Sequence, residues 1–247
     1  MRWRIVILML GVLLYAGGLV QSAVAHDYVY IDDGGNHLIE DAMYQNSSVI
    51  LDYHIANNPG THFQIVNGGN ILYLGACNNS TVTVNGGLIN YGVSVDNNSK
   101  LEVNGGTIGA IWAYDYSSVA VNGGAINGWI AASGNSIVEI RGGEFANLSD
   151  LMAYGSATIY LYGSSFSVGG VELNYGDSLR DYGVVGGANF NDLTGIITGT
   201  LLDGSLLNDE FFVPLNNPGG ADIIVIPEPA TSTLLLTAGV LLLRRKR

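Results

Sequence analysis

A pair of adjacent glycines recurs through the middle of the chain at nearly constant spacing. The pairs begin at Gly68, Gly86, Gly105, Gly123 and Gly142, and Gly163-Ser164 continues the series. The steps between them are 18, 19, 18, 19 and 21 residues. A unit this short cannot bury its own apolar side chains, whereas a stack of such units can. The spacing therefore predicts a solenoid.

Apolar residues recur at fixed offsets from the first glycine of each pair. They lie four residues before it (Val82, Leu101, Val119, Val138, Ile159), two before it (Val66, Val84, Val103, Val121, Ile140, Leu161), three after it (Ile71, Ile89, Ile108, Ile126, Phe145) and, less regularly, six after it (Leu74, Gly92, Ile111, Trp129, Leu148). Apolar residues two positions apart indicate half-buried strands. We expect two or three very short strands in each unit.

Polar residues at two further offsets predict the turns. Asparagine directly precedes the glycine pair at Asn67, Asn85, Asn104 and Asn122, and serine lies six residues before it at Ser80, Ser99, Ser117 and Ser136. Asn-Gly-Gly suits the positive φ angles of a sharp corner. If coils stack about 4.8 Å apart, identical side chains can hydrogen-bond to their copies above and below.

These patterns predict an all-β fold, a parallel β-solenoid with coils of about 18–21 residues. A right-handed β-helix, which resembles pectate-lyase and autotransporter passenger domains, is the favoured form. Left-handed hexapeptide helices also use about 18 residues per coil, but no period of six is evident. A β-sandwich would need longer strands. We expect a cap and first coil at residues 26–62, the repeats at 63–197, with Gly186-Gly187 marking one degenerate coil, and a second cap and linker at 198–226.

The first 25 residues are expected to be a signal peptide. Arg2 and Arg4 precede an apolar run, and Ala23 and Ala25 form the small-residue pattern that signal peptidase cleaves. The run would form a signal helix, and the mature chain would begin near His26. An uncleaved membrane anchor is the alternative.

The last 21 residues combine three features in a fixed order. Pro227, Glu228 and Pro229 come first, an apolar run of 14 residues follows, and the basic cluster Arg244, Arg245, Lys246 and Arg247 ends the chain. A comfortable transmembrane helix needs about 20 residues. This arrangement, residues 227–247, resembles the PEP-CTERM sorting signal of Gram-negative bacteria.

The resemblance implies a short membrane helix that holds the chain in the inner membrane before an exosortase-type peptidase processes it near the Pro-Glu-Pro box. It also implies an envelope or extracellular location and an association with extracellular polysaccharide. The basic cluster would stay on the cytoplasmic side. A permanent C-terminal anchor is the alternative.

The charge of the chain excludes one class of partner. The net charge is −12, and only Lys100, Arg141 and Arg180 are basic between residues 26 and 226. Affinity for nucleic acid depends on lysine and arginine at the phosphates, so we expect no nucleic-acid partner. Cys77 is the single cysteine of the chain, so no intramolecular disulfide can form.

Two carboxylates are the candidate ligand or cation site. Asp96 and Asp115 both lie ten residues after a first glycine, which would place them one rung apart, close enough to share a calcium ion or to act as an acid-base pair. Aspartate in such sequences is also a common turn former. Acidic residues near the start, Asp32, Asp33, Glu40 and Asp41, suggest a second calcium site. No cofactor and no other metal site is expected.

Three functions are compatible with this sequence. The leading one is a non-catalytic structural or adhesive protein of the cell surface or matrix, whose Tyr91, Trp112, Tyr114, Tyr116 and Trp129 would either stack on sugars or pack the fold. A polysaccharide lyase or hydrolase is the alternative, and a self-associating building block is the third. The chain contains no G-x-S-x-G, H-E-x-x-H or P-loop motif.

Overall fold

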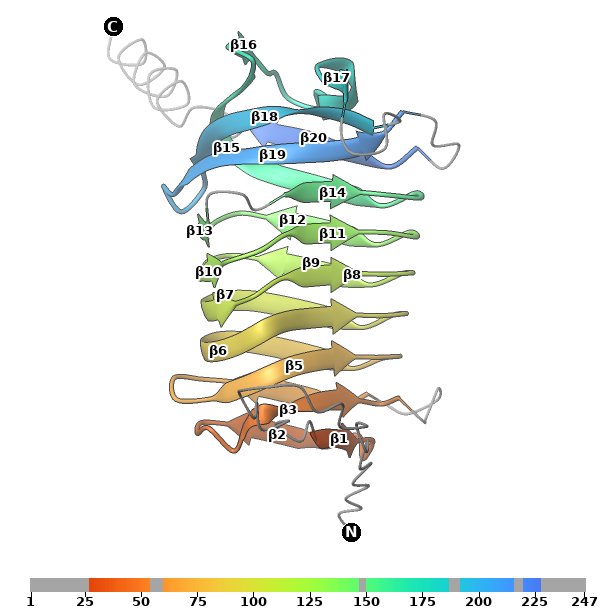
Figure 1. Ribbon diagram of the computed structural model, residues 1–247, viewed down its shortest axis with the longest axis vertical. Coiled ribbons are helices and arrows are strands. Elements are labelled where there is room, and N and C mark those ends of the chain that lie inside the picture. Colours follow the sequence, from red (N-terminus) through yellow and green to blue (C-terminus); the bar gives the residue numbers. More distant parts are fainter. Residues whose placement is uncertain (1–26, 54–59, 147–149, 187–191, 216–219, 228–247) are drawn as a thin grey trace, which may run out of the picture.

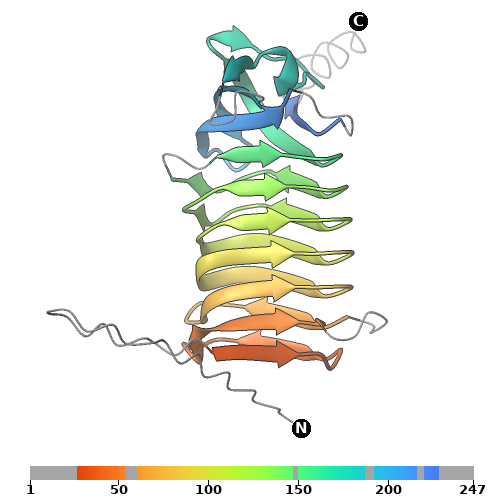
Figure 2. The same ribbon diagram turned by 45° about the vertical axis from the view of Figure 1, so that its right-hand side comes forward.

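The chain forms a parallel β-solenoid of about seven turns of about 19 residues. The structure is a computed structural model that describes residues 27–53, 60–146, 150–186, 192–215 and 220–227. Successive turns stack along one axis, from β1 at one end to the strands β18, β19 and β20 at the other (Figures 1 and 2). The predicted all-β solenoid is confirmed.

Two long faces of parallel strands make up the stack. On face A lie β2 (Asn36–Ile39), β4 (His62–Ile65), the start of β6 (Thr81–Val95), β7 (Lys100–Ile108), β9 (Ser118–Val121), β12 (Ile137–Ile140), β15 (Thr158–Val168) and β20 (Asp222–Pro227). On face B lie β1 (Asp27–Ile31), β3 (Tyr44–Leu51), β5 (Asn70–Ala76), the end of β6, β8 (Ile111–Ala113), β11 (Ile130–Ala132), β14 (Leu151–Ala153) and β19 (Leu206–Pro214).

A short third side joins face A to face B after each glycine pair. Here β10 (Ala125–Ile126) pairs in parallel with β7 before it and with β13 (Glu144–Phe145) after it. The glycine pair allows the sharp bend between face A and this side. At Gly106, for example, φ is +83°, and a Cβ would lie 2.7 Å from the backbone of Gly86 in the turn below.

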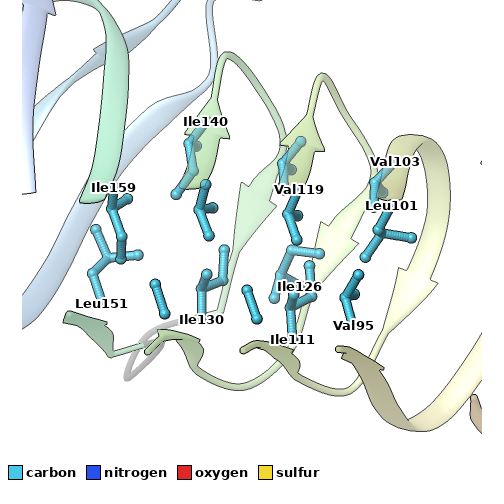
Figure 3. Close-up of a cluster of buried hydrophobic side chains, with 14 of the residues drawn as sticks. Val95, Leu101, Val103, Ile111, Val119, Ile126, Ile130, Ile140, Leu151 and Ile159 are labelled. Atoms are coloured by element: carbon cyan, nitrogen blue, oxygen red, sulfur yellow. The ribbon is translucent and has the colours of Figure 1, made fainter. Parts of the chain in front are cut away.

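The core is a set of apolar columns between the faces. Face A contributes residues such as Leu101, Val119 and Ile159, and face B contributes Ile111 and Ile130, all at most 2% exposed. Figure 3 shows these side chains pointing toward one another from the two rows of strands. Each fully buried aliphatic side chain stabilises the fold by about 1.5–3 kcal/mol. The stack therefore achieves the burial that one turn cannot.

The column predicted six residues after the glycine is confirmed at Leu74 and Ile111 and wrong at Gly92 and Trp129, while Leu148 lies outside the described residues. The inward column of face B is Leu74, Val93, Ile111, Ile130 and Leu151. Ile108 and Ile111 are separated by two residues, whereas three residues separate Ile126 from Ile130. Counting from the glycine across this corner therefore changes register from turn to turn. At the start of the repeats, Ile65 rather than Val66 pairs with Val84, for the same kind of reason.

The predicted serine column lies inside the turn between face B and face A. Ser80, Ser99, Ser117 and Ser136 are at most 1% exposed. Ser99 Oγ donates to the carbonyl of Asn78 at 3.1 Å, and Ser136 Oγ donates to that of Ala113 at 3.1 Å. Two of these four hydroxyls thus bind the backbone of the turn below, whereas Ser80 Oγ donates to the carbonyl of Cys77 in its own turn at 2.8 Å.

Beyond Gly163 the chain leaves the parallel pattern. β16 (Val171–Glu172), the 3₁₀ turn η1 (Leu179–Asp181), β17 (Val184–Gly186) and β18 (Asp192–Leu201) follow. β18 pairs antiparallel with β15, β17 and β19. Gly186 is therefore part of an antiparallel hairpin, and the predicted coil at Gly186-Gly187 was wrong.

The chain then returns to the stack. β19 pairs in parallel with β14 on face B, and β20 pairs in parallel with β15 on face A. β19 and β20 thus supply the last rung, whereas a cap and linker were expected at 198–226.

The predicted signal and tail lie largely outside the described residues. This holds for Ala23, Ala25, Glu228, Pro229 and the basic cluster, whereas Pro227 ends β20. Within the described ranges, no helix is long and apolar enough to cross a membrane.

Candidate functional site

An open groove of about 650 Å³ crosses the outer surface of face B and the adjoining corner. Five aromatic side chains line it, together with three hydroxyl or amide side chains and three small residues. The lining residues are Tyr28, Tyr73, Tyr91, Trp112 and Trp129, then Ser48, Asn90 and Asn127, and finally Gly109, Ala110 and Gly128. They come from turns between β1 and β11, so the groove extends along the stack rather than within one turn.

Three of the aromatic rings form a row. The ring centroids of Tyr73 and Trp112 are 6.3 Å apart and their planes are inclined by 49°. Those of Trp112 and Trp129 are 6.0 Å apart, with planes at 72°, an edge-to-face contact. Trp129 is 43% exposed and Tyr91 65% exposed, while Tyr73 and Trp112 are half-buried. The row is thus anchored in the surface and accessible from outside.

Small residues beside Trp112 create the room for its ring. On the neighbouring strands, Ser94 and Ala131 pair with Trp112. A Cβ added to Gly92 would lie 2.8 Å from Cζ3 of the indole, and Gly92 has φ of +144°. A larger residue at Gly92 would displace the ring, so the glycine and the tryptophan form one structural unit.

Amide groups lie beside the aromatic row. Asn90 and Asn127 follow the equivalent buried residues Ile89 and Ile126 at the corner, and both side chains are exposed. The Asn90 amide donates to Oδ1 of Asn70 at 2.9 Å, which fixes its orientation. The groove therefore combines apolar ring faces with a few polar groups, a common composition of small-molecule and glycan sites.

None of the lining residues carries a carboxylate or a basic group. Burial raises the pKa of Tyr73, an effect that its hydrogen bond with Ser94 opposes in part, so the phenol stays neutral at physiological pH. The groove is an uncharged strip on a chain of net charge −12.

Asp96 and Asp115 lie on consecutive turns but not in one column, which corrects the sequence prediction. Val95 pairs with Ala113, so Asp96 is aligned with Tyr114 and Asp115 with Asn97. The extra residue at the corner of the Asp96 turn explains the error. Asp115 has φ of +54°, like Asn78 and Asn97 at +57° and +58°. This is the left-handed turn conformation that Asn and Asp tolerate well.

Asp96 is the more unusual carboxylate. It accepts a hydrogen bond of 3.0 Å from the Ser94 hydroxyl, and the Cys77 thiol lies 3.9 Å from the same oxygen. Burial, followed by repulsion from Asp115, raises the pKa of Asp96, and the Ser94 and Cys77 contacts oppose this. Burial and the nearby carboxylates raise the pKa of Cys77 to about 11, so this thiol is protonated and unreactive near neutral pH.

The basic residues of the repeats lie away from these carboxylates. Lys100 is on the outer surface of face A, where it pairs with Thr81 and Ser118. Arg141 binds Glu139 at 2.7 Å, and its guanidinium lies 4.8 Å from the ring centroid of Tyr162. Neither supplies a cation beside Asp96 or Asp115, where an elimination reaction would need one.

The acidic residues near the start have local partners. Asp33 accepts hydrogen bonds from the amide of Gly35 at 2.8 Å and from His37 at 2.9 Å, and Asp41 accepts one from the amide of Met43 at 2.9 Å. Over the described part of the chain, no group of three or more His, Cys, Asp or Glu side chains could hold a metal ion. The suggested calcium sites thus have no complete ligand set there.

The asparagines of the repeat turns form an outward ladder. The Asn104 amide donates to Oδ1 of Asn85 at 3.0 Å, and the Asn122 amide donates to Oδ1 of Asn104 at 2.9 Å. In the turn below, Oδ1 of Asn67 packs against Gly86, which has no room for a Cβ. These residues stabilise the stack and present a repeated row of amides to solvent.

A buried carboxyl lies in the C-terminal cap. Asp209 on β19 is 2% exposed, and neither of its oxygens has a hydrogen-bond partner. Burial, with repulsion from Asp150 as a smaller cause, raises the pKa of Asp209 to about 7. Leu207, Phe211 and Val213 share its inward side, so the alternation in LNDEFFV was a signal that Asp209 points into the core.

The sequence prediction missed Tyr73, Asn90 and Asn127 as members of the groove. Tyr73 was detectable in principle, because it lies between the buried residues Ile71 and Leu74 and so next to the inward register. The two asparagines follow Ile89 and Ile126 and both lie four residues after a first glycine, so this shared offset was the signal that could have found them. Tyr114 and Tyr116, predicted with the tryptophans, are exposed residues of the turn outside the groove.

Comparisons with known proteins do not assign a family: no family model, curated protein or solved structure matches this chain.

Proposed function

We propose that this protein is a non-catalytic, exported protein of the bacterial surface or matrix, with a structural or adhesive role toward polysaccharide. The observation that carries the proposal is the outer surface of the solenoid. It presents an open, uncharged aromatic groove beside turns whose asparagines repeat along the axis. A long, regular surface of this kind suits contacts with a polymer.

The tail supports the proposed route of export. The resemblance of residues 227–247 to a PEP-CTERM signal suggests sorting from the inner membrane by an exosortase-type peptidase, after signal peptidase has removed residues 1–25. The body of the solenoid extends to Pro227, which pairs with Gly163 in the β15–β20 register. The Pro-Glu-Pro box thus begins at the last residue of the last rung, and a peptidase acting after Pro229 would release the whole fold.

Right-handed winding of the solenoid is part of the proposal. The course of the chain in Figure 1 supports it: the strands nearer the viewer run from left to right as the chain rises from β1 toward β20. This hand also matches the preference of parallel crossover connections.

A polysaccharide hydrolase or lyase is the second candidate. It is favoured by Asp96, whose pKa is raised and which lies close enough to Tyr73 to affect the pKa of that groove residue. A carboxyl that acts as a general acid needs a raised pKa, so that it still carries its proton near the working pH. The engagement of Arg141 by Glu139 and Tyr162 argues against it, as does the position of Asp115 in a different column.

Polysaccharide extracted from the host's own matrix tests the proposal directly. The protein, purified from its host in the form found there, should be retained on the immobilised polysaccharide, and soluble polysaccharide should elute it. Prolonged incubation should release no new reducing ends and no unsaturated products. Turnover that the substitution Asp96→Asn abolishes would replace the proposal with the enzyme. Absence of retention together with concentration-dependent polymers would favour the self-associating building block.

A further inference from the structure

We propose that the aromatic groove binds single, twisted chains of an uncharged polysaccharide, with Trp112 and Trp129 as stacking platforms. This inference rests on the proposed function, and it names the site and the class of ligand. The other binding surfaces of the molecule, including the asparagine ladder, are not required for it.

The lining of the groove matches the two sides of a pyranose. A sugar ring exposes an apolar face of C–H groups and carries its hydroxyls around the edge. The ring faces of Trp112, Trp129 and Tyr73 can stack on the apolar face of the sugar, because they are apolar and partly exposed. The hydroxyl edge suits the two amides: Asn127 can donate to and accept from hydroxyls, and Oδ1 of Asn90 can accept from them, while the NH2 group of Asn90 already donates to Asn70 and Ile71.

The angles between the rings select among neutral polysaccharides. Coplanar rings would suit the flat face of a crystalline polymer. Here the planes of Tyr73 and Trp112 are inclined by 49° and those of Trp112 and Trp129 by 72°, at centroid distances near 6 Å. Successive sugars can contact these rings only if the chain rotates between residues, so a soluble, twisted chain fits and a crystalline surface does not.

Charge selects against acidic polysaccharides. The groove offers no lysine or arginine to a uronate or sulfate, and the rest of the chain is strongly acidic. An anionic polymer would therefore be repelled and would gain no ion pair in return. Binding of a neutral chain costs little desolvation free energy, since the lining has no ionised group that would lose its water.

The groove is open along the stack, which suits a polymer that continues past it on both sides. It is lined by residues from Tyr28 on β1 to Trp129 next to β11. A proline-rich peptide is the other occupant that aromatic grooves accept. The exposed side chains of Asn90 and Asn127, at the same corner of turns two apart, favour a ligand with many hydroxyls over such a peptide.

Affinity electrophoresis of the full-length protein tests the inference with defined probes. These are hydroxyethylcellulose, galactomannan and dextran as soluble neutral chains, alginate as an acidic chain, and microcrystalline cellulose in a parallel pull-down. At least one neutral soluble polymer should retard the protein, whereas alginate and the crystalline polymer should have no effect. Trp129→Ala should weaken the binding by about tenfold, as expected for the loss of a tryptophan anchor.

Tyr116→Ala is the matched control. Tyr116 is 69% exposed, more than Trp129, but lies outside the groove, so its removal should leave binding unchanged. Trp129→Phe should restore most of the affinity, because a ring face remains. The melting temperatures of all variants should agree within a few degrees, and Trp129 is sufficiently exposed for this to be expected.

The outcomes separate the groove from the proposed function. If the host polysaccharide retains the wild type and Trp129→Ala equally well, the groove is not the site, while the adhesive function stands. Binding to alginate alone, or to a proline-rich peptide and no glycan, would also overturn this inference. If the wild type binds neither the defined probes nor the host polysaccharide, both proposals fail.

Discussion

The side-chain amide of Asn122 donates a hydrogen bond of 2.9 Å to Oδ1 of Asn104, the equivalent residue one turn earlier. Asn104 in turn donates to Asn85 at 3.0 Å. Each of these asparagines thus donates a hydrogen bond to the equivalent asparagine one turn earlier, so the sequence repeat produces a row of hydrogen bonds along the stack. Removal of a middle member should affect two turns at once.

The first prediction concerns this ladder. Asn104→Ala should lower the free energy of unfolding by about 1–3 kcal/mol, because two side-chain hydrogen bonds of about 0.5–1.5 kcal/mol each are lost. Urea unfolding of the purified protein measures the change. Asn98→Ala, an exposed asparagine in the other turn, should cost less than 0.5 kcal/mol, as is usual for surface substitutions. Equal effects of the two would show that the ladder adds nothing to stability.

The buried serine column gives a second prediction, with two residues of opposite behaviour. Ser136 Oγ donates to the Ala113 carbonyl and accepts from the Ser133 amide, each at 3.1 Å. Ser117 Oγ is buried with no partner. Ser136→Ala should therefore destabilise the protein by about 1–2 kcal/mol, whereas Ser117→Ala should be neutral or stabilising, because an unsatisfied hydroxyl disappears.

Thermal unfolding of the two serine variants side by side decides this point. Alanine already occupies the same column at Ala157, where it is fully buried, so the methyl group fits the site. A loss of stability in Ser117→Ala comparable with that in Ser136→Ala would contradict the account.

A third prediction separates close packing from backbone strain at glycine. Gly106 and Gly204 have similar φ angles, +83° and +91°, but a Cβ at Gly106 would lie 2.7 Å from the Gly86 backbone, whereas nothing lies within 4 Å of one at Gly204. Gly204→Ala should cost about 1–2 kcal/mol from the left-handed conformation alone. Gly106→Ala should lower the free energy of unfolding by clearly more than Gly204→Ala does. Urea unfolding of the two variants measures both changes. Equal costs would mean that the turns can separate easily.

The fourth prediction is a pH dependence of stability caused by Asp209. Its pKa rises from 3.8 to about 7 on folding, so the folded state binds this proton more tightly than the unfolded chain does. The stabilising contribution of the protonated form is complete below about pH 4 and is lost as the pH rises to about 7. Asp209→Asn should therefore match the wild type near pH 4 and exceed its stability by about 2–4 kcal/mol at pH 8.

Unfolding curves at pH 4, 6 and 8 measure this difference. Glu210→Gln, which changes the neighbouring outward residue, is the control and should show no such growth with pH. A constant difference between Asp209→Asn and the wild type across this range would show that folding does not raise the pKa of Asp209.

Much of the architecture followed from the sequence because each turn repeats the same local requirements. The apolar pairs at Leu101 and Val103 and at Val119 and Val121 predicted face A correctly, since no residue is inserted between them and the glycines. The prediction failed where the corner length varies. One extra residue before Val93 shifted the offsets of Gly92 and Asp96, and so produced a false carboxylate pair.

The groove was harder to predict for a related reason. Tyr73, Trp112 and Trp129 lie at different offsets from their glycines, and they meet only because their turns stack and because Gly92 leaves room for an indole. Likewise, β19 and β20 return to the stack after an antiparallel excursion that has no repeat signal. Local periodicity cannot encode either feature.

The central claim is that the protein is exported and acts outside the inner membrane. The most direct test is the intact mass of the protein from its native host, recorded for each cell fraction and with both terminal peptides identified. We predict a chain that begins near His26, lacks the residues after about Pro229, and is found in the envelope or matrix fraction. A chain that retains Arg247 in the inner membrane would contradict the account.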